Sequence, residues 1–430
     1  MKEVRILVFP CGSEIGLEIH NALKDIYFIT LIGASSVSDH GKFVYKNYSE
    51  EVPMISDNNF IDKLNDLIKK EKIDFIFPAM DEVMNVLSSN REKLSAKVLA
   101  PSHEAVDTCC SKKNTYEVLS HCDFVPKVYN SPNEIEEYPV IIKPDRGYGS
   151  RGFMKIDNEE TLCFELEHRN YENVICEYLP GEEYTIDCFT DKNRDLRYCS
   201  FRVRNRIKNG ISVNSYLQDS DETIKRIAEE INKRIKMQGA WFFQVKKNMN
   251  GEYKLLEVAT RIAGTMCVER AAGVNLPLLT VFDAMGYDVE VNKQFNYVEV
   301  DRALSNLYFL NESYSEVYVD FDDTIIIKDK VNLNLIKFLY QCVNNNIPIY
   351  LITKHIKDIK LSLKKYKINY DLFEKIIVLD RSKKKCDLIE PKADAIFIDD
   401  SFSERREMFE RHNIKVIGVD GIEALIDYRQ

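Results

Sequence analysis

The chain has 430 residues, 45% of them hydrophobic and 30% charged, with a formal net charge of −10; this size predicts two to four domains, and the composition is ordinary for a globular protein. The acidic balance argues against a protein that binds duplex nucleic acid, because phosphate contacts need clustered Lys and Arg, but it allows a local basic pocket for small anions. No long apolar run and no signal-peptide pattern occur, and the eleven cysteines lack metal-ligand spacing, so we expect a cytoplasmic protein with reduced thiols and no membrane span.

Residues 1–107 alternate short apolar runs with helical patterns. The expected strands are residues 4–9, 28–32 and 74–78, and the expected helices include residues 59–70. Strands that alternate with helices indicate βαβ units and a parallel sheet. We therefore expect an α/β domain in this segment.

Residues 108–310 mix helices with pairs of strands, which is typical of an α+β domain. Strands are expected at residues 138–143, 173–178, 184–189 and 253–258. A helix is expected at residues 221–237, because Asp221 can cap it and isoleucines recur every three or four residues.

A polar linker at residues 311–316 leads into a third segment, residues 313–430. Strands are expected there at residues 317–319, 347–352, 375–379, 395–398 and 415–419, and a helix at residues 332–343. This β-α-β-α order predicts a second doubly wound α/β domain.

A candidate phosphate-binding loop follows the strand at residues 140–143, which ends in Lys143. Glycines stand at positions 147, 149 and 152. Glycine lets backbone N–H groups approach phosphate oxygens, and a lysine adds a charge that neutralises polyphosphate. A glycine-rich hairpin with a surface lysine has the same pattern, so these residues alone leave both interpretations open.

Carboxylates follow in two later strand pairs. A strand, a Pro-Gly turn and a second strand bring Glu177 and Glu183 near each other, and a carboxylate can accept both hydroxyls of a ribose. Gln244 and Glu257 are expected to face each other from two paired strands, and Mg²⁺ binds through one or two carboxylates plus substrate phosphates. Arg261 lies four residues beyond Glu257, where it can hold a transferring phosphoryl group.

The order and spacing of these segments resemble an ATP-grasp enzyme of the carbamoyl-phosphate-synthetase-like branch, over residues 1 to about 310. The resemblance implies a Rossmann-like pre-ATP-grasp domain at residues 1–107 and an ATP-grasp domain at residues 108–310. Lys112 would be the first phosphate-binding lysine, in a segment where Ser111 replaces the family's Asp. The nucleotide-binding residues that the resemblance implies are Lys112, Lys143, Gly149, Ser150, Glu177, Tyr178, Leu179 and Glu183. The implied metal ligands are Gln244 and Glu257.

Ala259 departs from the family's pattern, which places Asn between the metal-binding Glu and the Arg. Alanine cannot coordinate Mg²⁺, so water, Thr260 or substrate must complete the shell of the ion, or a second metal is held loosely. The resemblance implies ATP and Mg²⁺ as cofactors, with Mn²⁺ as an alternative. It also implies an acyl-phosphate mechanism with Arg261 as a catalytic residue, in which the protein mainly positions the reactants.

Arg202, Arg204 and Arg206 alternate along an expected strand and therefore share one face of it. This face can meet a triphosphate or an anionic substrate. It can equally be a solvated strand face, because charge runs are usually solvated.

Asp320 and Asp322 come directly after the apolar strand at residues 317–319. Active sites of α/β sheets lie at the carboxyl ends of the strands. Asp320 can attack phosphorus as a nucleophile, and Asp322 can protonate the leaving oxygen and then activate water.

Together with residues at the ends of later strands, these aspartates resemble the haloacid-dehalogenase-like phosphatases, over residues 315–430. The resemblance implies a capless domain, since only nine residues separate Asp322 from the next expected helix. The implied catalytic residues are Asp320, Asp322, Thr353 and Lys385, with Lys383 and Lys384 as rivals for the lysine. The implied metal ligands are Asp320, Asp322, Asp399 and Asp400.

The leading hypothesis is a bifunctional enzyme: an ATP-dependent carboxylate–amine ligase with a phosphatase of the same pathway. Its partners would be a small carboxylate, an amine and a phosphorylated metabolite, without nucleic acid or membrane, and a homodimer is compatible with it. The first alternative is a hydrolase whose ATP-grasp half only binds nucleotide. The second is a ligase with a non-catalytic C-terminal module.

Overall fold

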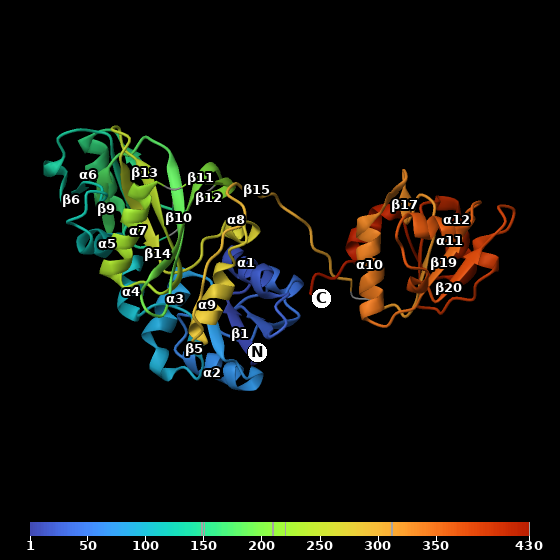
Figure 1. Ribbon diagram of the computed structural model, residues 1–430. Helices are drawn as coiled ribbons and strands as arrows, with labels where there is room; N and C mark the ends of the chain where they lie inside the picture. Colours follow the sequence, from blue (N-terminus) through green and yellow to red (C-terminus); the bar gives the residue numbers. More distant parts are fainter. Residues whose placement is uncertain (148, 150, 209, 220, 311–312, 430) are drawn as a thin grey trace. The chain divides into compact units, whose positions relative to one another are not determined.

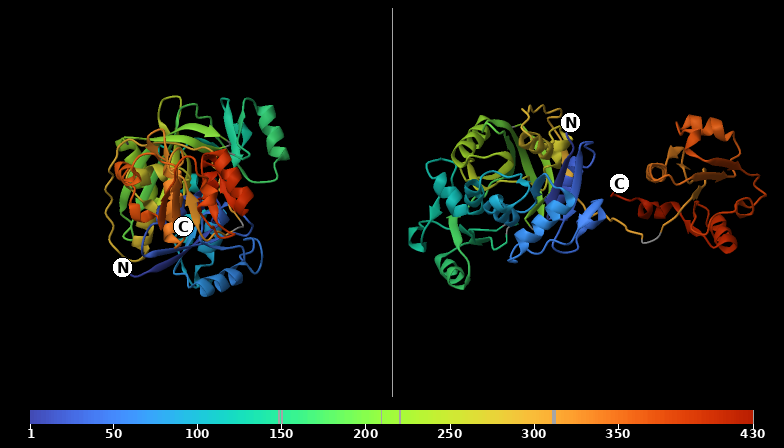
Figure 2. Two further views of the ribbon diagram at one scale, coloured as in Figure 1. Left: turned by 90° about the vertical axis from the view of Figure 1, so that its right-hand side faces the viewer. Right: turned by 90° about the horizontal axis from the view of Figure 1, so that it is seen from below.

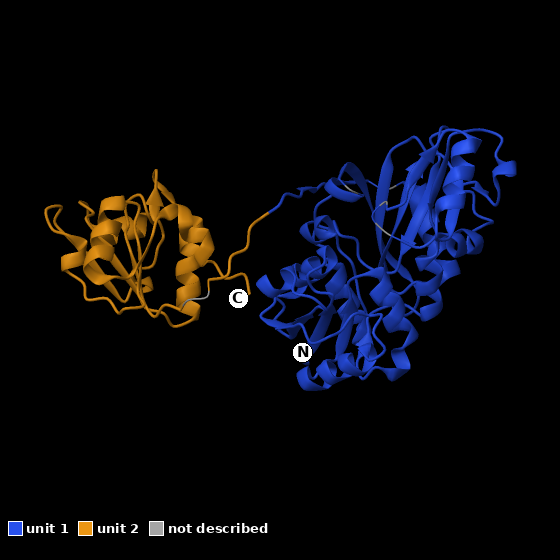
Figure 3. Cartoon of the chain, turned by 180° about the vertical axis from the view of Figure 1, so that it is seen from behind, with its two compact units in different colours: residues 1–304 blue, residues 305–430 orange. Residues whose placement is uncertain are grey.

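The computed structural model describes residues 1–147, 149, 151–208, 210–219, 221–310 and 313–429. The chain forms two compact units, Met1–Leu304 and Ser305–Gln430, here called the N-terminal unit and the C-terminal unit (Figure 3). Within the described residues, no helix is long and apolar enough to cross a membrane. The mixed α/β, multidomain architecture predicted from the sequence is confirmed.

The N-terminal unit begins with a five-stranded parallel sheet in the order β3-β2-β1-β4-β5. Its strands are β1 (Val4–Phe9), β2 (Ile29–Ala34), β3 (Asn47–Ser49), β4 (Phe75–Pro78) and β5 (Lys97–Val98). The apolar runs of β1 and β4 are buried on both faces, as expected for the interior strands of a parallel sheet.

Helices cover both faces of this sheet. One face packs on α2 (Phe60–Glu71) and α3 (Asp81–Ser89). The other packs on α1 (Glu14–Leu23) and on α9 (Leu276–Ala284), which returns from far along the sequence. Phe28 and Phe282 stack there with ring centroids 5.7 Å apart. Figure 1 shows α9, in yellow, against the blue N-terminal elements.

The next part of the N-terminal unit holds two antiparallel sheets. The smaller has the order β6-β9-β7-β8 and packs on α6. The larger has the order β14-β13-β10-β11-β12-β15 and packs on α7, whose N-cap is Asp221 as predicted. The helices are α4 (His103–Cys110), α5 (Lys112–Val118), α6 (Glu159–His168), α7 (Glu222–Ile235) and α8 (Cys267–Ala271). The strands are β6 (Val128–Tyr129), β7 (Val140–Pro144), β8 (Met154–Ile156), β9 (Asn173–Glu177), β10 (Glu183–Thr190), β11 (Leu196–Lys208), β12 (Ile211–Gln218), β13 (Gly239–Lys247), β14 (Tyr253–Ala259) and β15 (Glu299–Asp301).

The C-terminal unit is built on a five-stranded parallel sheet in the order β20-β19-β16-β21-β22. A short hairpin, β17–β18, lies between β16 and α10 in the sequence. Helices α10 and α11 pack on one face of the sheet and α12 on the other, and Figure 2 shows this unit in orange and red from two further directions. The elements are β16 (Val317–Val319), β17 (Ile326–Ile327), β18 (Lys330–Val331), α10 (Leu333–Asn344), β19 (Ile349–Thr353), α11 (Ile359–Lys365), β20 (Lys375–Val378), β21 (Ile396–Ile398), α12 (Phe402–His412) and β22 (Lys415–Ile417).

Candidate functional site

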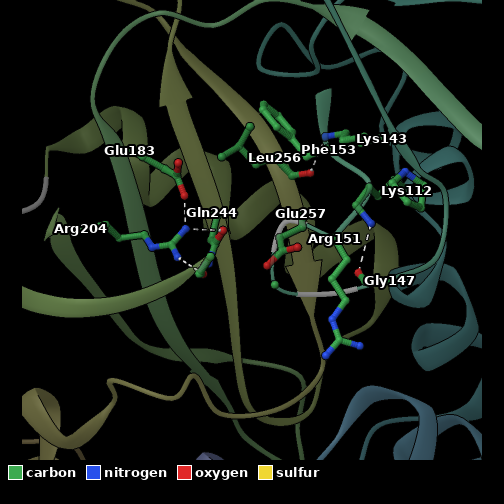
Figure 4. A pocket seen from close by; sticks show the side chains of 13 residues that line it. Lys112, Lys143, Gly147, Arg151, Phe153, Glu183, Arg204, Gln244, Leu256 and Glu257 are labelled. Carbon is green, nitrogen blue, oxygen red and sulfur yellow. Dashed lines mark hydrogen bonds and ion pairs between the residues drawn. The ribbon is translucent and has the colours of Figure 1, made fainter. Parts of the chain in front are cut away.

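A cavity of about 140 Å³ lies in the N-terminal unit between the two antiparallel sheets (Figure 4). We call it the central cavity. Lysines, carboxylates and glycines from segments far apart in the sequence meet there. Its lining consists of Lys112, Lys143, Pro144, Gly147, Gly149, Arg151, Phe153, Glu183, Arg204, Gly210, Gln244, Leu256 and Glu257.

The register of the larger sheet aligns four polar side chains in one row across four strands. Glu257 of β14 pairs with Gln244 of β13, Gln244 pairs with Thr185 of β10, and Thr185 pairs with Arg202 of β11. Directly paired residues of antiparallel strands point to the same face. Gln244 and Glu257 therefore face each other as predicted, and two oxygen-bearing side chains are available to a hard cation such as Mg²⁺.

Lys143 ends the buried run of β7 and reaches under the central cavity. Its Nζ donates to the hydroxyl of Tyr116 at 2.8 Å and to the carbonyl of Leu256 at 3.3 Å. Burial acts to lower the pKa of Lys143, but its neighbours Tyr116 and Cys176 outweigh burial and raise that pKa. Two hydrogen bonds therefore hold this buried lysine at the central cavity.

Lys112 opens helix α5 and lines the same cavity. Its Nζ lies 3.2 Å from the carbonyl oxygen of Asp145 and 3.3 Å from that of Gly147. Burial lowers the pKa of Lys112, and Glu257 opposes that shift. The two predicted phosphate-binding lysines thus reach one cavity from different elements, together with Glu257.

Arg204 connects Glu183, which was predicted to bind the ribose, with Gln244, which was predicted to bind the metal ion. Its Nη1 forms an ion pair with Glu183 and donates to Oε1 of Gln244 at 3.2 Å. Its Nη2 donates to the carbonyl of Gly210 at 2.8 Å. The face shared by the three arginines of β11 is not uniformly solvated, because Arg202 is buried against Asp187 whereas Arg206 makes an exposed ion pair with Asp301.

The glycine-rich loop contributes Gly147 and Gly149 to the cavity lining. Gly149 has a φ of +66° and Gly210 a φ of +77°, so side chains are disfavoured at both positions. A Cβ on Gly210 would lie 2.5 Å from the backbone of Gly149, which shows how closely the two loops approach. Ser150, the other predicted loop residue, lies outside the described residues.

The predicted adenine-binding residues lie apart from the lining of the central cavity. The carboxylate of Glu177 accepts the backbone N–H of Lys127 at 2.8 Å. The ring of Tyr178 lies under Lys155, and Leu179 is buried. Adenine binding by this segment stays a prediction.

Arg261 is held by Asp81, which lies in α3 of the parallel-sheet part of the N-terminal unit. Its Nε and Nη2 donate to the two carboxylate oxygens of Asp81 at 2.8 and 2.6 Å. The N-cap of α3 is Met80, and Asp81 lies in the first turn of this helix with its carboxylate on Arg261. Asp81 therefore positions the guanidinium of a proposed catalytic residue.

Ala259 packs in a small apolar cluster with Phe242 and Ala263. Its side chain offers no ligand atom, and Thr260 is buried outside the lining of the central cavity. Of the alternatives that the sequence left open, completion of the ion's shell by water or substrate, or a second metal that is held loosely, stays a prediction.

A buried carboxyl group lies near this site. Glu269 of α8 is fully buried and accepts a hydrogen bond from the hydroxyl of Tyr198 at 2.6 Å. Burial, and then the charge of Asp187, raise the pKa of Glu269 from 4.5 to about 7. A carboxyl group with a raised pKa in the folded state stabilises the fold only while it is protonated.

We therefore expect the contribution of Glu269 to the free energy of unfolding to fall by about 2–3 kcal/mol as the pH rises from about 4.5 to about 7. Glu269→Gln removes the ionisable group, so its free energy of unfolding relative to the wild type should increase across this range. Urea unfolding at several pH values measures this difference. Glu229→Gln, at an exposed position of α7, serves as the control. If the difference in free energy of unfolding between Glu269→Gln and the wild type does not vary with pH, the raised pKa of Glu269 is wrong.

Three carboxylates gather at the carboxyl edge of the C-terminal sheet. Asp320, Asp399 and Asp400 each offer an oxygen, and these oxygens lie within 4.8 Å of one another, an arrangement that could hold a metal ion. The Nζ of Lys385 lies 2.8 Å from Asp320 and 2.6 Å from Asp399. Burial raises the pKa of Asp399 to about 6, although Lys385 opposes the shift. A hard cation fits this donor set, since it would relieve the repulsion between the carboxylates.

The other predicted residues of the C-terminal unit surround this cluster. Thr353 is fully buried at the end of β19. Asp322 lies outside the cluster of three carboxylates, and both of its carboxylate oxygens contact Nδ1 of His355, at 2.9 and 3.0 Å. Nε2 of His355 lies 2.8 Å from the hydroxyl of Ser362. The sequence interpretation missed His355, although its position two residues after Thr353 was a usable signal.

Two families match parts of the N-terminal unit. Residues 170–303 match the family described as ATP-grasp in the biosynthetic pathway with Ter operon, and residues 43–101 match the PylC-like N-terminal domain. Among curated proteins, the chain is 23% identical over 145 residues to the carbamoyl phosphate synthase arginine-specific large chain of Halalkalibacterium halodurans. That match covers 30% of this chain and 14% of the relative, so the chain spans only a small part of its length.

Solved structures share the fold at low sequence identity. The biotin carboxylase domain of Hydrogenobacter thermophilus 2-oxoglutarate carboxylase, in complex with MgADP, ADP and bicarbonate, has a TM-score of 0.58 at 17% identity and covers 70% of this chain and 74% of that chain. The L-amino acid ligase of Bacillus licheniformis has a TM-score of 0.53 at 14% identity and covers 66% of this chain and 75% of that chain. The N-terminal unit thus shares the fold of these solved structures, and two of its segments are similar to an ATP-grasp family and to the PylC-like N-terminal domain.

Proposed function

We propose that the protein is an ATP- and Mg²⁺-dependent ligase that joins a carboxylate to an amine, or to a similar nucleophile, through an acyl phosphate. The observation that carries this proposal is the central cavity, where Lys112, Lys143 and Glu257 meet although they lie in three separate segments of the chain. The similar solved structures include an L-amino acid ligase and a biotin carboxylase domain in complex with MgADP.

The proposed roles follow from the contacts. Lys112 and Lys143 neutralise the phosphates of ATP, and Glu183 accepts the ribose hydroxyls once Arg204 has shifted from it. Gln244 and Glu257 would hold Mg²⁺, which supplies charge neutralisation at the transferring phosphoryl group. Arg261, fixed by Asp81, stabilises the charge that develops during transfer.

The decisive experiment measures ADP release with pools of carboxylic acids and amines, followed by product mass. A ligase releases ADP only when both substrates are present and yields a product heavier than either. If no combination of acids and amines releases ADP while the nucleotide still binds, the N-terminal unit is a nucleotide-binding module and the ligase proposal is wrong.

A second activity is proposed for the C-terminal unit, on a separate observation. The cluster of Asp320, Asp399 and Asp400 with Lys385 between two of them matches the needs of phosphate-ester hydrolysis on an aspartyl nucleophile. A divalent cation and Lys385 would bind the phosphate, Asp320 would attack phosphorus, and Asp322 would protonate the leaving oxygen. Asp322 would then take a proton from a water molecule that attacks phosphorus, which releases inorganic phosphate and frees Asp320. Together with the ligase, this makes the protein bifunctional.

Hydrolysis of p-nitrophenyl phosphate tests this second activity. We expect turnover with Mg²⁺ or Mn²⁺ that EDTA abolishes and excess Mg²⁺ restores. A panel of phosphorylated metabolites, assayed by phosphate release, then ranks the substrates. If neither the model ester nor any member of the panel is hydrolysed, the C-terminal unit is a non-catalytic module.

A further inference from the structure

A second cavity, of about 290 Å³, adjoins the central cavity and shares Gln244 and Glu257 with it. It extends from the larger antiparallel sheet to the segments that follow β1 and β4. Its lining includes Ser13, Glu14, Thr185, Arg202, Arg302 and the pair of Asp81 with Arg261. A molecule bound in either cavity would therefore lie beside Gln244 and Glu257.

The floor of the second cavity presents hydrogen-bonding groups that the protein leaves unused. Thr185 is 1% exposed, and its hydroxyl has no hydrogen-bond partner in the described part of the chain. A buried hydroxyl without a partner has lost its hydrogen bonds to water without replacement, so a ligand that satisfies it is favoured. Thr185 lies in the row that also carries Gln244 and Glu257, so a group bound to it would lie beside the proposed metal ligands.

Arg202 is the cross-strand neighbour of Thr185 on the same floor. Its Nε donates to Asp187 at 2.5 Å and its Nη1 contacts the hydroxyls of Thr265 and Ser215. These contacts fix the guanidinium in place beside Thr185, in the lining of the second cavity. A carboxylate is the group that would accept from both Arg202 and Thr185.

The rim of the cavity carries a negative charge beside a positive one. Glu14, in the first turn of α1, pairs with Arg302 at 3.3 Å, and both side chains are partly exposed. Gly264 lies against Glu14. A Cβ atom at position 264 would come within 2.9 Å of Oε2 of Glu14. Glu14 therefore provides an anion at the cavity, separate from the Asp81–Arg261 pair.

This distribution of charge decides the class of ligand. A ligand with carboxylates alone would compete with Glu14 for Arg302, and a simple amine would leave Arg202 and Thr185 without an acceptor. A molecule with a carboxylate and an ammonium group matches both sites, and complementary charges give such a site its selectivity.

We propose that the second cavity binds an α-amino acid, with its carboxylate on Thr185 and Arg202 and its ammonium group toward Glu14. Because Thr185 is the direct neighbour of Gln244, one of the two proposed metal ligands, we take this amino acid to be the acid substrate of the ligase, and that role rests on the proposed function. A carboxylate oxygen attacks the γ-phosphorus of ATP, the bond from phosphorus to the bridging oxygen breaks, and ADP leaves. An amine then attacks the carbonyl carbon of the acyl phosphate, and inorganic phosphate leaves while the amine loses a proton to solvent.

Calorimetric titration of the full chain, with and without the non-hydrolysable analogue AMP-PNP and Mg²⁺, tests the binding itself. The probes are L-alanine, L-glutamate and L-lysine. The controls are propionate and succinate, which carry only carboxylates, and ethylamine, which carries only an ammonium group. We expect at least one amino acid to bind and none of the three controls. Equal binding of propionate or succinate, or no binding of any amino acid under either condition, would overturn the proposal.

Two substitutions sharpen the test. Thr185→Val should weaken amino-acid binding about tenfold, because one hydrogen bond to a charged group is lost, and Thr185→Ser should restore it. Thr30→Val, in strand β2 outside the cavity, controls for the loss of a threonine hydroxyl. If Thr185→Val binds the amino acid with unchanged affinity, Thr185 does not bind its carboxylate.

The outcome separates this inference from the proposed function. If amino acids bind but never support ADP release, the ligase proposal fails and the amino-acid site stands. If ADP release occurs only with acids that lack an ammonium group, the ligase stands and the amino-acid site is wrong.

Discussion

Glu257→Gln is expected to lower the rate of ADP release by about 100- to 1,000-fold, the loss that follows when a group stabilising transition-state charge is removed. Glu257 lines the central cavity, the second cavity and a third cavity beside Asp81 and Cys110. It is thus the carboxylate at which nucleotide, metal and substrate would meet. The glutamine keeps the size of the side chain but removes the charge that a divalent cation requires.

The measurement is a coupled ADP assay at saturating Mg²⁺ with the substrates found in the screen. Glu252→Gln, in the exposed turn before β14, is the matched control and should retain the wild-type rate. Nucleotide binding by the variant, measured without turnover, should fall less than the rate does, because Lys112 and Lys143 are still present. A rate within twofold of the wild type would remove Glu257 from the proposed metal site.

The second large effect is expected in the C-terminal unit. Asp320→Asn should lower hydrolysis of p-nitrophenyl phosphate by about 1,000-fold or more, the scale seen when a covalent nucleophile is removed. Burial raises the pKa of the Asp320 carboxyl even though Lys385 opposes the shift, so a neutral amide costs the fold little. Lys385 also keeps its contact with Asp399 at 2.6 Å.

Asp329→Asn provides the control, since Asp329 is exposed and contacts Lys365 and Tyr366 rather than the carboxylate cluster. Thermal unfolding of both variants verifies that the unit is folded. If Asp320→Asn hydrolyses the ester as well as Asp329→Asn does, any phosphatase activity in the preparation does not come from this site.

Local patterns predicted much of the fold. The sequence predicted the apolar strands β1 and β16 and the isoleucine-rich face of helix α7. Each of these patterns depends only on residues a few positions apart. Gln244 and Glu257 could be paired from the sequence for a similar reason, since β13 and β14 are consecutive antiparallel strands joined by a short connection. Such pairings need little more than the periodicity of a strand and a turn signal.

The rest of the site depends on contacts between distant segments. Asp81 and Arg261 lie 180 positions apart, and an acidic residue in the first turn of a helix has a sufficient local explanation in the helix dipole. Arg204 was recognised as one of an alternating series, but its pairing with Glu183 depends on the alignment of β10 with β11. Neither contact could be inferred before the sheets were assembled.

The packing of α9 on the N-terminal sheet has a consequence for synthesis of the protein on the ribosome. Phe28, Ile29 and Leu23 belong to a face that α9 helps to cover, and α9 ends only at Ala284. At 5–20 residues per second, translation from residue 107 to residue 284 takes about 10–35 s. During that interval the sheet of a nascent chain has one apolar face incompletely covered, so this face is where chaperones would bind and where a truncated product would aggregate.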